Sequence, residues 1–273
     1  MLRRGFEIGM SIGNISTALL NGIHYIQKAL MGGVNLIDLR GEVEYQLRLI
    51  DKYSPSHSKA YISYFQQTIS LLINKETSIN QTVKDISSFE EFSEALAFHH
   101  AMQSFWLGRY ERCNFYADRV NAYTDIGKLK SLILQFYNGL SAFRLMRSKK
   151  KKPFEDITKN SIEAMRAARA DSKWNYGNKL HLLEAERYSS TGMKEKAKVA
   201  YCAAIESSCA SRFIHEQALA CEFAALHFSR IGEKETAMSF LNQAKECYAK
   251  WGSQTKVDFV ASEINTLKSK IQK

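Results

Sequence analysis

Proline is almost missing from this chain of 273 residues, which has 2 prolines and only 14 glycines. A sheet-rich fold needs many tight turns, and these two residues usually build them. The 5 cysteines are an odd number with no C-x-x-C pair, which excludes a disulfide scaffold and indicates reduced thiols. With 45% hydrophobic and 24% charged residues, the chain is neither disordered nor collagen-like. These features together favour a globular, helical protein.

Motifs that carry chemistry are missing as well. The sequence has no G-x-x-x-x-G-K-[ST] loop for nucleotide phosphates, no kinase glycine-rich loop with H-R-D and D-F-G, and no H-E-x-x-H. We therefore predict no catalytic residue, no cofactor and no metal site, and we expect that the protein is not an enzyme.

A long hydrophobic run is also lacking, although one stretch imitates it. Residues Ile8 to Gln27 carry no charge and follow Arg3 and Arg4, as in a signal peptide or a membrane span. Polar residues recur throughout this stretch, and no small-residue cleavage site follows a clean apolar core. The stretch predicts a buried amphipathic helix and no transmembrane segment. Together with the reduced thiols, this indicates a cytoplasmic protein.

What the sequence does contain is a helical period. Apolar residues recur at steps of three and four in nearly every segment, and the alternation typical of strands is scarce. Roughly a dozen helices of ordinary size fit this length. Breakers separate the segments, namely Gly32, Gly33, Pro55, Gly108, Gly127, Pro153, Gly177, Gly192, Gly232 and Gly252. This spacing predicts antiparallel helical hairpins with short loops.

Two segments of the second half align without a gap, one starting at Gly192 and the other at Gly232, which gives a period near 40. The matched positions are Gly192, Ala197, Tyr201 and Ala204 in one copy and Gly232, Ala237, Leu241 and Ala244 in the other. A fainter copy begins at Gly108. The glycine lets the chain reverse, and the small residues let two helices approach closely. The period is longer than the ~34 of a tetratricopeptide repeat (TPR), so we predict an all-α solenoid of TPR-like antiparallel hairpins.

The domain organisation follows from how well each part fits this repeat. We predict a single helical-repeat domain over residues 1–273, with degenerate hairpins over 1–147. A basic loop over 148–153 then leads to better-conforming repeats over 154–273.

The region after about residue 180 carries a more particular pattern. Its last part reads Ala244-Lys245-Glu246-Cys247-Tyr248-Ala249-Lys250-Trp251-Gly252, followed by Lys256-Val257. This resembles the helical-repeat region that follows the ATPase domain in large predicted-ATPase signalling proteins, which also carry serine/threonine-kinase-like and histidine-kinase modules. In that family the tail is alanine-lysine-x-x-tyrosine, then tryptophan-glycine, then lysine-valine. Tyr248, Trp251 and Gly252 therefore join the repeat signature.

The resemblance implies a non-catalytic scaffold that binds a protein partner or a neighbouring domain in an ATPase- or kinase-linked signalling system. One helix of each hairpin would line a groove for an extended or helical peptide. The first alternative is a detached or truncated regulatory segment of a larger multidomain signalling ATPase or kinase. The second is binding of a polyanion, nucleic acid or anionic lipid, through the basic second half.

Histidines and cysteines invite hypotheses of chemistry, for which packing is the simpler interpretation. His99 and His100 are adjacent, so their side chains point about 100° apart on a helix and do not chelate one ion. We expect one in the core and one at the surface. His215 and His227 are expected to pack or cap rather than to form an acid/base pair. The cysteines, expected to be buried, are Cys113, Cys202, Cys209, Cys221 and Cys247.

A basic run is the most visible local anomaly. Between Arg144 and Lys198, 15 basic residues stand against 7 acidic ones. The run itself consists of Arg147, Lys149, Lys150, Lys151 and Lys152. It could bind a polyanion or direct nuclear import through residues 147–153, but a solvated loop is the simpler interpretation. Aromatic residues do not interleave with it, so nucleic-acid binding is not expected.

Overall fold

The computed structural model describes residues 1–53, 56–74, 93–121, 127–148 and 152–271. Within these ranges the chain forms thirteen helices and no strand, so the predicted all-α class is confirmed. The helices fall into two compact units. Unit 1 contains Met1–Phe92 with Lys250–Thr255, and unit 2 contains Ser93–Ala249 with Lys256–Lys273. This division lies far from residues 148–153, where the sequence suggested a change in repeat quality.

Unit 1 is built from four helices, α1 (Leu2–Ser11), α2 (Ile15–Met31), α3 (Leu36–Tyr53) and α4 (Ser56–Ile73). Apolar side chains at helical spacing fill its core, among them Ile23, Ile26 and Val43. The uncharged N-terminal stretch is two helices rather than the single one predicted. The reason is Gly13, whose φ of 74° reverses the chain between them. No described helix is both long and apolar enough to cross a membrane.

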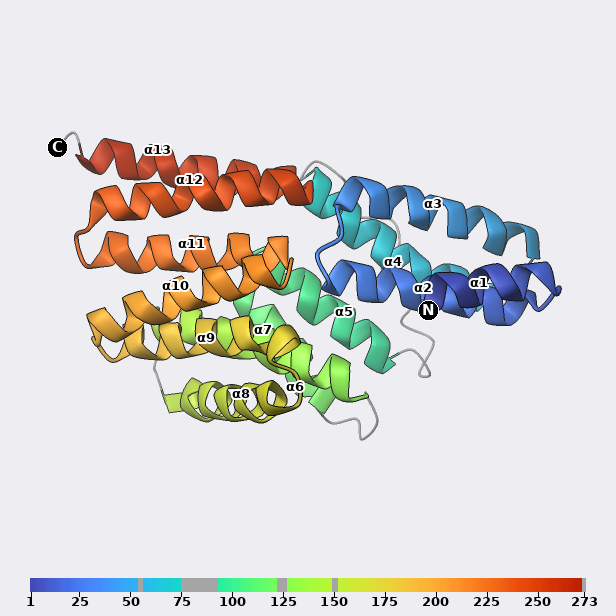
Figure 1. Cartoon of the computed structure of the whole chain (residues 1–273), viewed down its shortest axis with the longest axis horizontal. Helices are drawn as coiled ribbons and strands as arrows, with labels where there is room; N and C mark the ends of the chain where they lie inside the picture. Colours follow the sequence, from blue (N-terminus) through green and yellow to red (C-terminus); the bar gives the residue numbers. More distant parts are fainter. Residues whose placement is uncertain (54–55, 75–92, 122–126, 149–151, 272–273) are drawn as a thin grey trace. The chain divides into compact units, whose positions relative to one another are not determined.

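Unit 2 is a succession of antiparallel helices, of which α8 to α13 can be followed in order (Figure 1). Its helices are α5 (Ser93–Trp106), α6 (Tyr110–Asn121), α7 (Lys128–Met146), α8 (Lys152–Asp171), α9 (Lys173–Ser190), α10 (Lys194–Ala210), α11 (Ile214–Arg230), α12 (Lys234–Trp251) and α13 (Gln254–Ile271). The ends of α12 and α13 at their shared turn belong to unit 1. Alternate helices also touch, α5 with α7, α7 with α9 and α9 with α11. We call these four the A-helices.

The turns of unit 2 follow a strict spacing. Gly192, Arg212 and Gly232 follow one another at equal intervals in the chain, and all three have positive φ, 75°, 60° and 89°. The next residue of each turn donates its N–H to a carbonyl five residues earlier, which closes the helix in the Schellman manner. Gly252, with φ 88°, continues the series in unit 1. Two successive turns of this series span one hairpin, which is the physical basis of the repeat found in the sequence.

The repeat-signature side chains lie where two helices meet. Ala197, Tyr201 and Ala204 on α10 are fully buried, and so are Ala237 and Ala244 on α12, while Leu241 on α12 is almost so. Tyr248 is fully buried in unit 2, and Trp251 is fully buried in unit 1. Gly108 provides the positive φ of 72° between α5 and α6. The small residues allow close approach, and the large ones fill the remaining space.

The breakers and the basic loop predicted from the sequence differ in part from the structure. Gly177 is not a breaker, because it lies inside α9, where a Cβ would meet Ser207 Oγ at 3.3 Å. Lys152 and Pro153 begin α8 rather than ending a loop, since proline is compatible with the first helical turn. Residues 149–151 and Pro55 lie outside the described residues.

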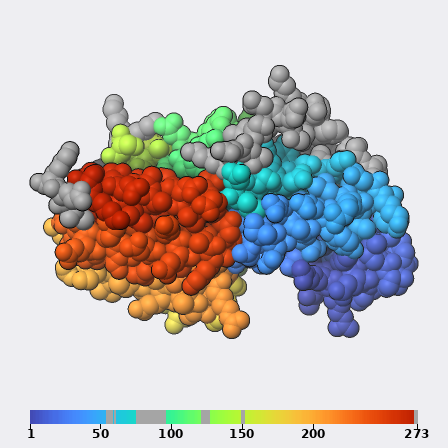
Figure 2. Space-filling view, turned by 90° about the horizontal axis from the view of Figure 1, so that it is seen from above, coloured from blue at the N-terminus to red at the C-terminus, as the bar shows by residue number. Residues whose placement is uncertain are grey.

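Figure 2 shows α12 and α13, in orange-red and red, at the front of unit 2, and no deep hollow is seen on their surface. A cavity of about 40 Å³ lies between α11, α12 and α13 and is lined by residues including Ala225, Leu241 and Leu267. Ligand pockets are usually about 300–1,000 Å³. This cavity is therefore too small for a metabolite.

Candidate functional site

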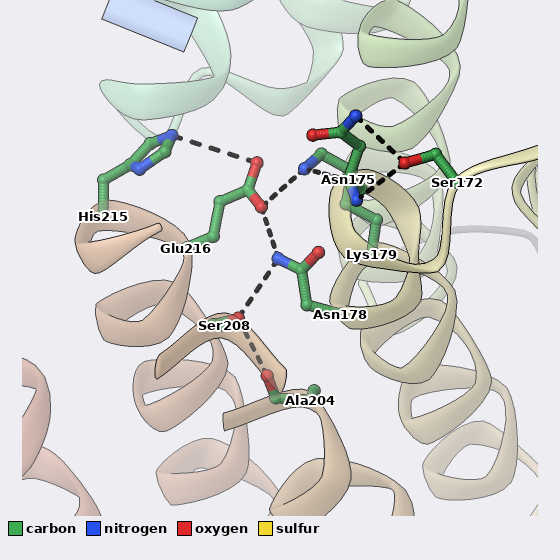
Figure 3. A network of polar contacts seen from close by, with 8 residues as sticks. All are labelled: Ser172, Asn175, Asn178, Lys179, Ala204, Ser208, His215 and Glu216. Carbon is green, nitrogen blue, oxygen red and sulfur yellow. Dashed lines mark hydrogen bonds and ion pairs between the residues drawn. The ribbon is translucent and has the colours of Figure 1, made fainter. Parts of the chain in front are cut away.

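The most unusual feature of unit 2 is the number of charged side chains buried among its helices. Glu216, near the start of α11, is 1% exposed and accepts from Lys179 Nζ on α9 at 2.7 Å. Its second donor is the amide of Asn178, which also donates to Ser208 Oγ on α10 at 3.1 Å. Figure 3 shows the carboxylate pointing from α11 toward α9, with His215 on its other side. The carboxylate thus joins α11 to α9, and Asn178 extends the network to α10.

Glu186, near the end of α9, holds a second network. Its side chain is fully buried, and Arg147 Nη2, just beyond α7, lies 2.6 Å from Oε2. The hydroxyl of Tyr201 on α10 donates to Oε1. Burial, followed by the charge of Glu186, raises the pKa of Tyr201 well above its usual range, so this phenol stays a neutral donor.

Glu222 holds a third network on the buried α11. Its Oε2 accepts from the Tyr248 hydroxyl of α12 at 2.7 Å and from Lys256 Nζ of α13 at 2.8 Å. Burial and the adjacent Glu222 raise the pKa of Tyr248 well above its ordinary value. The arrangement repeats that of Glu186, with one carboxylate shared by one cation and one tyrosine.

Arg144 of α7 connects the second and third networks. Burial opposes its charge, but Tyr110 and the carboxylates Glu222 and Glu186 raise the pKa of Arg144 above its ordinary value. Its guanidinium carbon lies 5.3 Å from the ring centre of Tyr110 and 5.3 Å from that of Phe223. The charges of both carboxylates thus act on this cation, and two aromatic rings lie against it.

Together these groups form what we call the charge chain: Arg147, Glu186, Arg144, Glu222 and Lys256. Its charges alternate in sign from α7 to α13, and each buried charge has an opposite neighbour. With Lys179 and Glu216, each of the steps α7–α9, α9–α11 and α11–α13 is bridged by one buried ion pair. Buried charges of this kind fix the register between helices, because a shift leaves a charge without its partner.

The space between the A-helices is filled by their own side chains. The Trp106 ring of α5 lies 5.7 Å from the His215 ring of α11, and Tyr137 of α7 contacts Trp106. Burial raises the pKa of Tyr137 far above its usual range. Trp106 therefore packs in the interior, whereas Trp174 at the start of α9 is 56% exposed.

The histidines do not gather into one site. His99 is buried, as expected for one member of the pair, but His100 is half-buried rather than at the surface, and it stacks on Tyr116 with ring centres 4.9 Å apart. Burial lowers the pKa of His99 to about 3. His215 contacts Trp106, while His227, at the other end of α11, shares a hydrogen bond of 2.9 Å with Ser189 Oγ. Among the described residues, no group of histidine, cysteine and carboxylate side chains has the arrangement of a metal site.

The cysteines are less uniform than predicted. Cys113, Cys221 and Cys247 are buried, Cys202 is half-buried and Cys209 is exposed. Cys209 lies near the end of α10 on the helix face that turns away from the core, which the apolar pattern did not distinguish. Burial raises the pKa of Cys113 to about 12, so this thiol remains protonated.

Sequence reasoning missed the charge chain, although a signal was present. Glu222 interrupts the apolar run from Ala218 to Ala225, and Glu186 stands one residue after the buried Ala185. A charge on the apolar stripe of a helix predicts a buried, paired group, because an unpaired one would be too costly. The partner could not be identified in this way, since Arg147 and Glu186 are separated by the whole of α8 and most of α9.

The chain was compared with models of known protein families and with curated protein sequences. Neither a model of a known protein family nor a curated protein sequence matched the chain. The resemblance to the helical-repeat region of large signalling ATPases thus remains a prediction from the residues quoted for it.

Proposed function

We propose that this protein is a non-catalytic helical-repeat scaffold that binds a protein partner in an ATPase- or kinase-linked signalling system. The charge chain is the observation that carries the first part of the proposal. The link to signalling is supported only by the sequence resemblance around Tyr248, Trp251 and Gly252.

The charge chain favours a binding function over catalysis, because the titratable groups in the interior are paired with one another and stabilise the fold. A general acid or base must reach a substrate and exchange its proton near neutral pH. Glu186 and Glu222 each hold a cation and a tyrosine inside the protein. Buried His99, with its pKa near 3, stays neutral throughout the physiological range. Groups used in this way fix the helices, which leaves the surface as the place where the protein acts.

The position of the partner follows from the same packing. A peptide between the A-helices would have to displace Trp106, Arg144 and Phe223, which fill that space. The edges of the helix stack, where the turns lie, are open to a partner without such a rearrangement. Repeat proteins with stacked hairpins offer extended edges and faces of this kind for protein binding.

The proposal is tested by affinity capture from the native host with the whole chain as bait, after nuclease treatment. An unrelated helical-repeat protein of similar isoelectric point is the control. We expect one protein at near-stoichiometric amount that carries a P-loop ATPase or a kinase domain. Capture that depends on nucleic acid would favour the polyanion alternative instead. The absence of any partner above the control would contradict the proposal.

A further inference from the structure

One edge of unit 2 gathers arginines from helices that are far apart in the sequence. The A-helices α7, α9 and α11 run in the same direction, so their C-terminal ends lie on the same side. Arg147 follows the end of α7, and Arg230 is the last residue of α11. Between them α9 contributes Ser189, which is hydrogen-bonded to His227 of α11. We call Arg144, Arg147 and Arg230 with these two residues the rim cluster.

The arginines of the rim cluster carry more positive charge than the carboxylates around them neutralise. Arg147 has one ion-pair partner, Glu186, and its Nε and Nη1 are buried and donate no hydrogen bond within the described residues. Partial burial and then the charge of Arg147, with a contribution from Arg144, lower the pKa of Arg230. Arg230 donates from Nε to the carbonyl of Leu226 at 2.8 Å, and its terminal nitrogens make no hydrogen bond or ion pair with the other described residues. Arginines that repel one another and keep unused donors are stabilised by an added anion.

The inner groups do not remove this excess. Glu222 already holds Lys256, and the charge of Arg144 interacts with both Glu222 and Glu186. Along the charge chain and Arg230, four cations stand against two carboxylates: Arg144, Arg147, Arg230 and Lys256 against Glu186 and Glu222. Glu233, whose charge acts on His227, adds a third carboxylate and leaves an excess of one positive charge. The excess lies at the outer end, where Arg230 is exposed.

We propose that the rim cluster is a recognition site for carboxylates of an acidic segment in a protein partner. This inference rests on the proposed function and specifies the chemistry of its partner. The exposed, planar guanidinium group of Arg230 matches a carboxylate, and the charge of the nearby Arg147, whose guanidinium nitrogens are buried, adds to the attraction.

The surroundings favour an acidic peptide over nucleic acid. Tyr201 and Phe228, which contact His227, and Phe223, which lies against Arg144, are buried and offer no ring to a base, and Tyr110, also against Arg144, is half-buried. The site is also short, because it spans the ends of three helices rather than a basic groove along them. A few carboxylates fill such a site, whereas a phosphate backbone needs a continuous track of cations.

The test uses a fluorescein-labelled peptide of eight glutamates, blocked at both ends, and fluorescence anisotropy with the full chain at low salt. We expect binding to the wild type and a dissociation constant raised at least about tenfold by Arg230→Gln. Arg147→Gln should act in the same direction, and circular dichroism checks that this variant still folds without the partner of Glu186. Arg230→Gln keeps that ion pair and remains informative if Arg147→Gln does not fold.

Arg166→Gln is the matched control, because Arg166 is an exposed arginine on α8, a helix that contributes no residue to the rim cluster. It pairs with Glu184 at 2.9 Å. The variant should bind the peptide like the wild type, and a peptide of eight glutamines should not bind. Equal losses in Arg166→Gln and Arg230→Gln would mean diffuse attraction to a basic protein and would overturn the proposal. The proposal would also be overturned if the wild type did not bind the glutamate peptide. The same holds if it bound a single-stranded oligothymidine more tightly than the peptide and Arg230→Gln abolished that binding.

Affinity capture with Arg230→Gln as bait separates this inference from the proposed function. A partner that the wild type captures and Arg230→Gln loses supports both. A partner captured equally by both baits overturns the rim cluster as its site and leaves the scaffold function standing. Binding of the glutamate peptide without any captured protein supports the rim cluster and contradicts the scaffold function.

Discussion

Lys179 Nζ lies 2.7 Å from Glu216 Oε2, and the two side chains are 2% and 1% exposed. Removing either partner leaves the other buried without its counter-ion. We expect Lys179→Met or Glu216→Gln to lower the free energy of unfolding by about 3 kcal/mol each. Urea denaturation followed by circular dichroism measures the change.

The double variant Lys179→Met/Glu216→Leu distinguishes a paired role from two separate ones. Because it removes both charges together, its cost should be well below the sum of the single costs. Additive losses would contradict the pairing. Lys128→Gln is the control, since Lys128 makes an equally short contact of 2.6 Å with Asp171 at the surface. Its denaturation midpoint should match that of the wild type, because exposed pairs are screened by solvent.

His99 should make the protein less stable in mild acid. Burial, with smaller contributions from Lys130 and His100, lowers the pKa of His99 from 6.5 to about 3. The unfolded chain therefore binds a proton below pH 6.5 that the folded chain refuses, and stability falls as the pH decreases toward 3. This residue alone should cost about 2 kcal/mol between pH 7 and pH 5.

The check is the pH dependence of thermal unfolding in wild type and His99→Leu. The variant cannot titrate at this position, so its stability should decline less over the same interval. His181→Gln, which changes a half-buried histidine on α9, should keep most of the wild-type dependence. A decline of equal steepness in wild type and His99→Leu would contradict the assignment.

Arg212 occupies a backbone conformation that favours glycine. Its φ is 60°, while the equivalent positions of the preceding and following turns are Gly192 and Gly232. A side chain in this region is disfavoured by roughly 1–2 kcal/mol, part of which is offset because glycine adds freedom to the unfolded chain. We expect Arg212→Gly to stabilise the protein by about 1 kcal/mol and Gly232→Ala to destabilise it by a similar amount.

Denaturant midpoints of the two variants measure these opposite effects. Arg212→Ala serves as the control, since it removes the charge and keeps the Cβ. It should not reproduce the gain of Arg212→Gly. If it did, the arginine charge rather than the backbone would be the cause.

The thiols should differ sharply in reactivity. Cys209 is exposed and Cys202 half-buried, whereas Cys113, Cys221 and Cys247 are buried. Burial raises the pKa of Cys221 and lowers its content of reactive thiolate. With an aromatic disulfide reagent in mild alkali, we expect one fast thiol, one slower thiol and three that react only on unfolding.

Cys209→Ser should remove the fast phase and leave the rest unchanged. Stopped-flow absorbance resolves the phases in the native protein, and denaturant then reveals the protected thiols. Fast reaction of Cys113 or Cys221 in the native state would show that α6 or α11 is less tightly packed than described.

The helices and most turns could be predicted from the sequence, because they depend on residues that are close together in the chain. Apolar steps of three and four specify a helix, and glycine allows the positive φ of Gly108, Gly192 and Gly232. The repeat predicted which small residues would be buried, and Ala197 and Ala237 are. Arg212 was missed because no glycine marks its turn. Its place midway between Gly192 and Gly232 would have indicated it.

The candidate site could be anticipated only in part. Glu186 and Glu222 stand on apolar helix faces, so their burial was readable from the sequence. Their partners could not be read from the sequence, because two residues that form an ion pair can lie at any separation along the chain. The rim cluster was even harder to predict from the sequence, since Arg147 and Arg230 are separated by α8, α9, α10 and nearly all of α11.

Local sequence is therefore sufficient for the helical class, the hairpin period and the close-packed seams, all of which arise within single helices and the turns between them. The division into two units and the pairing of charges across α7, α9, α11 and α13 became visible only in the folded chain. A buried charge is stable only beside its counter-ion, and the packing of distant helices selects that neighbour.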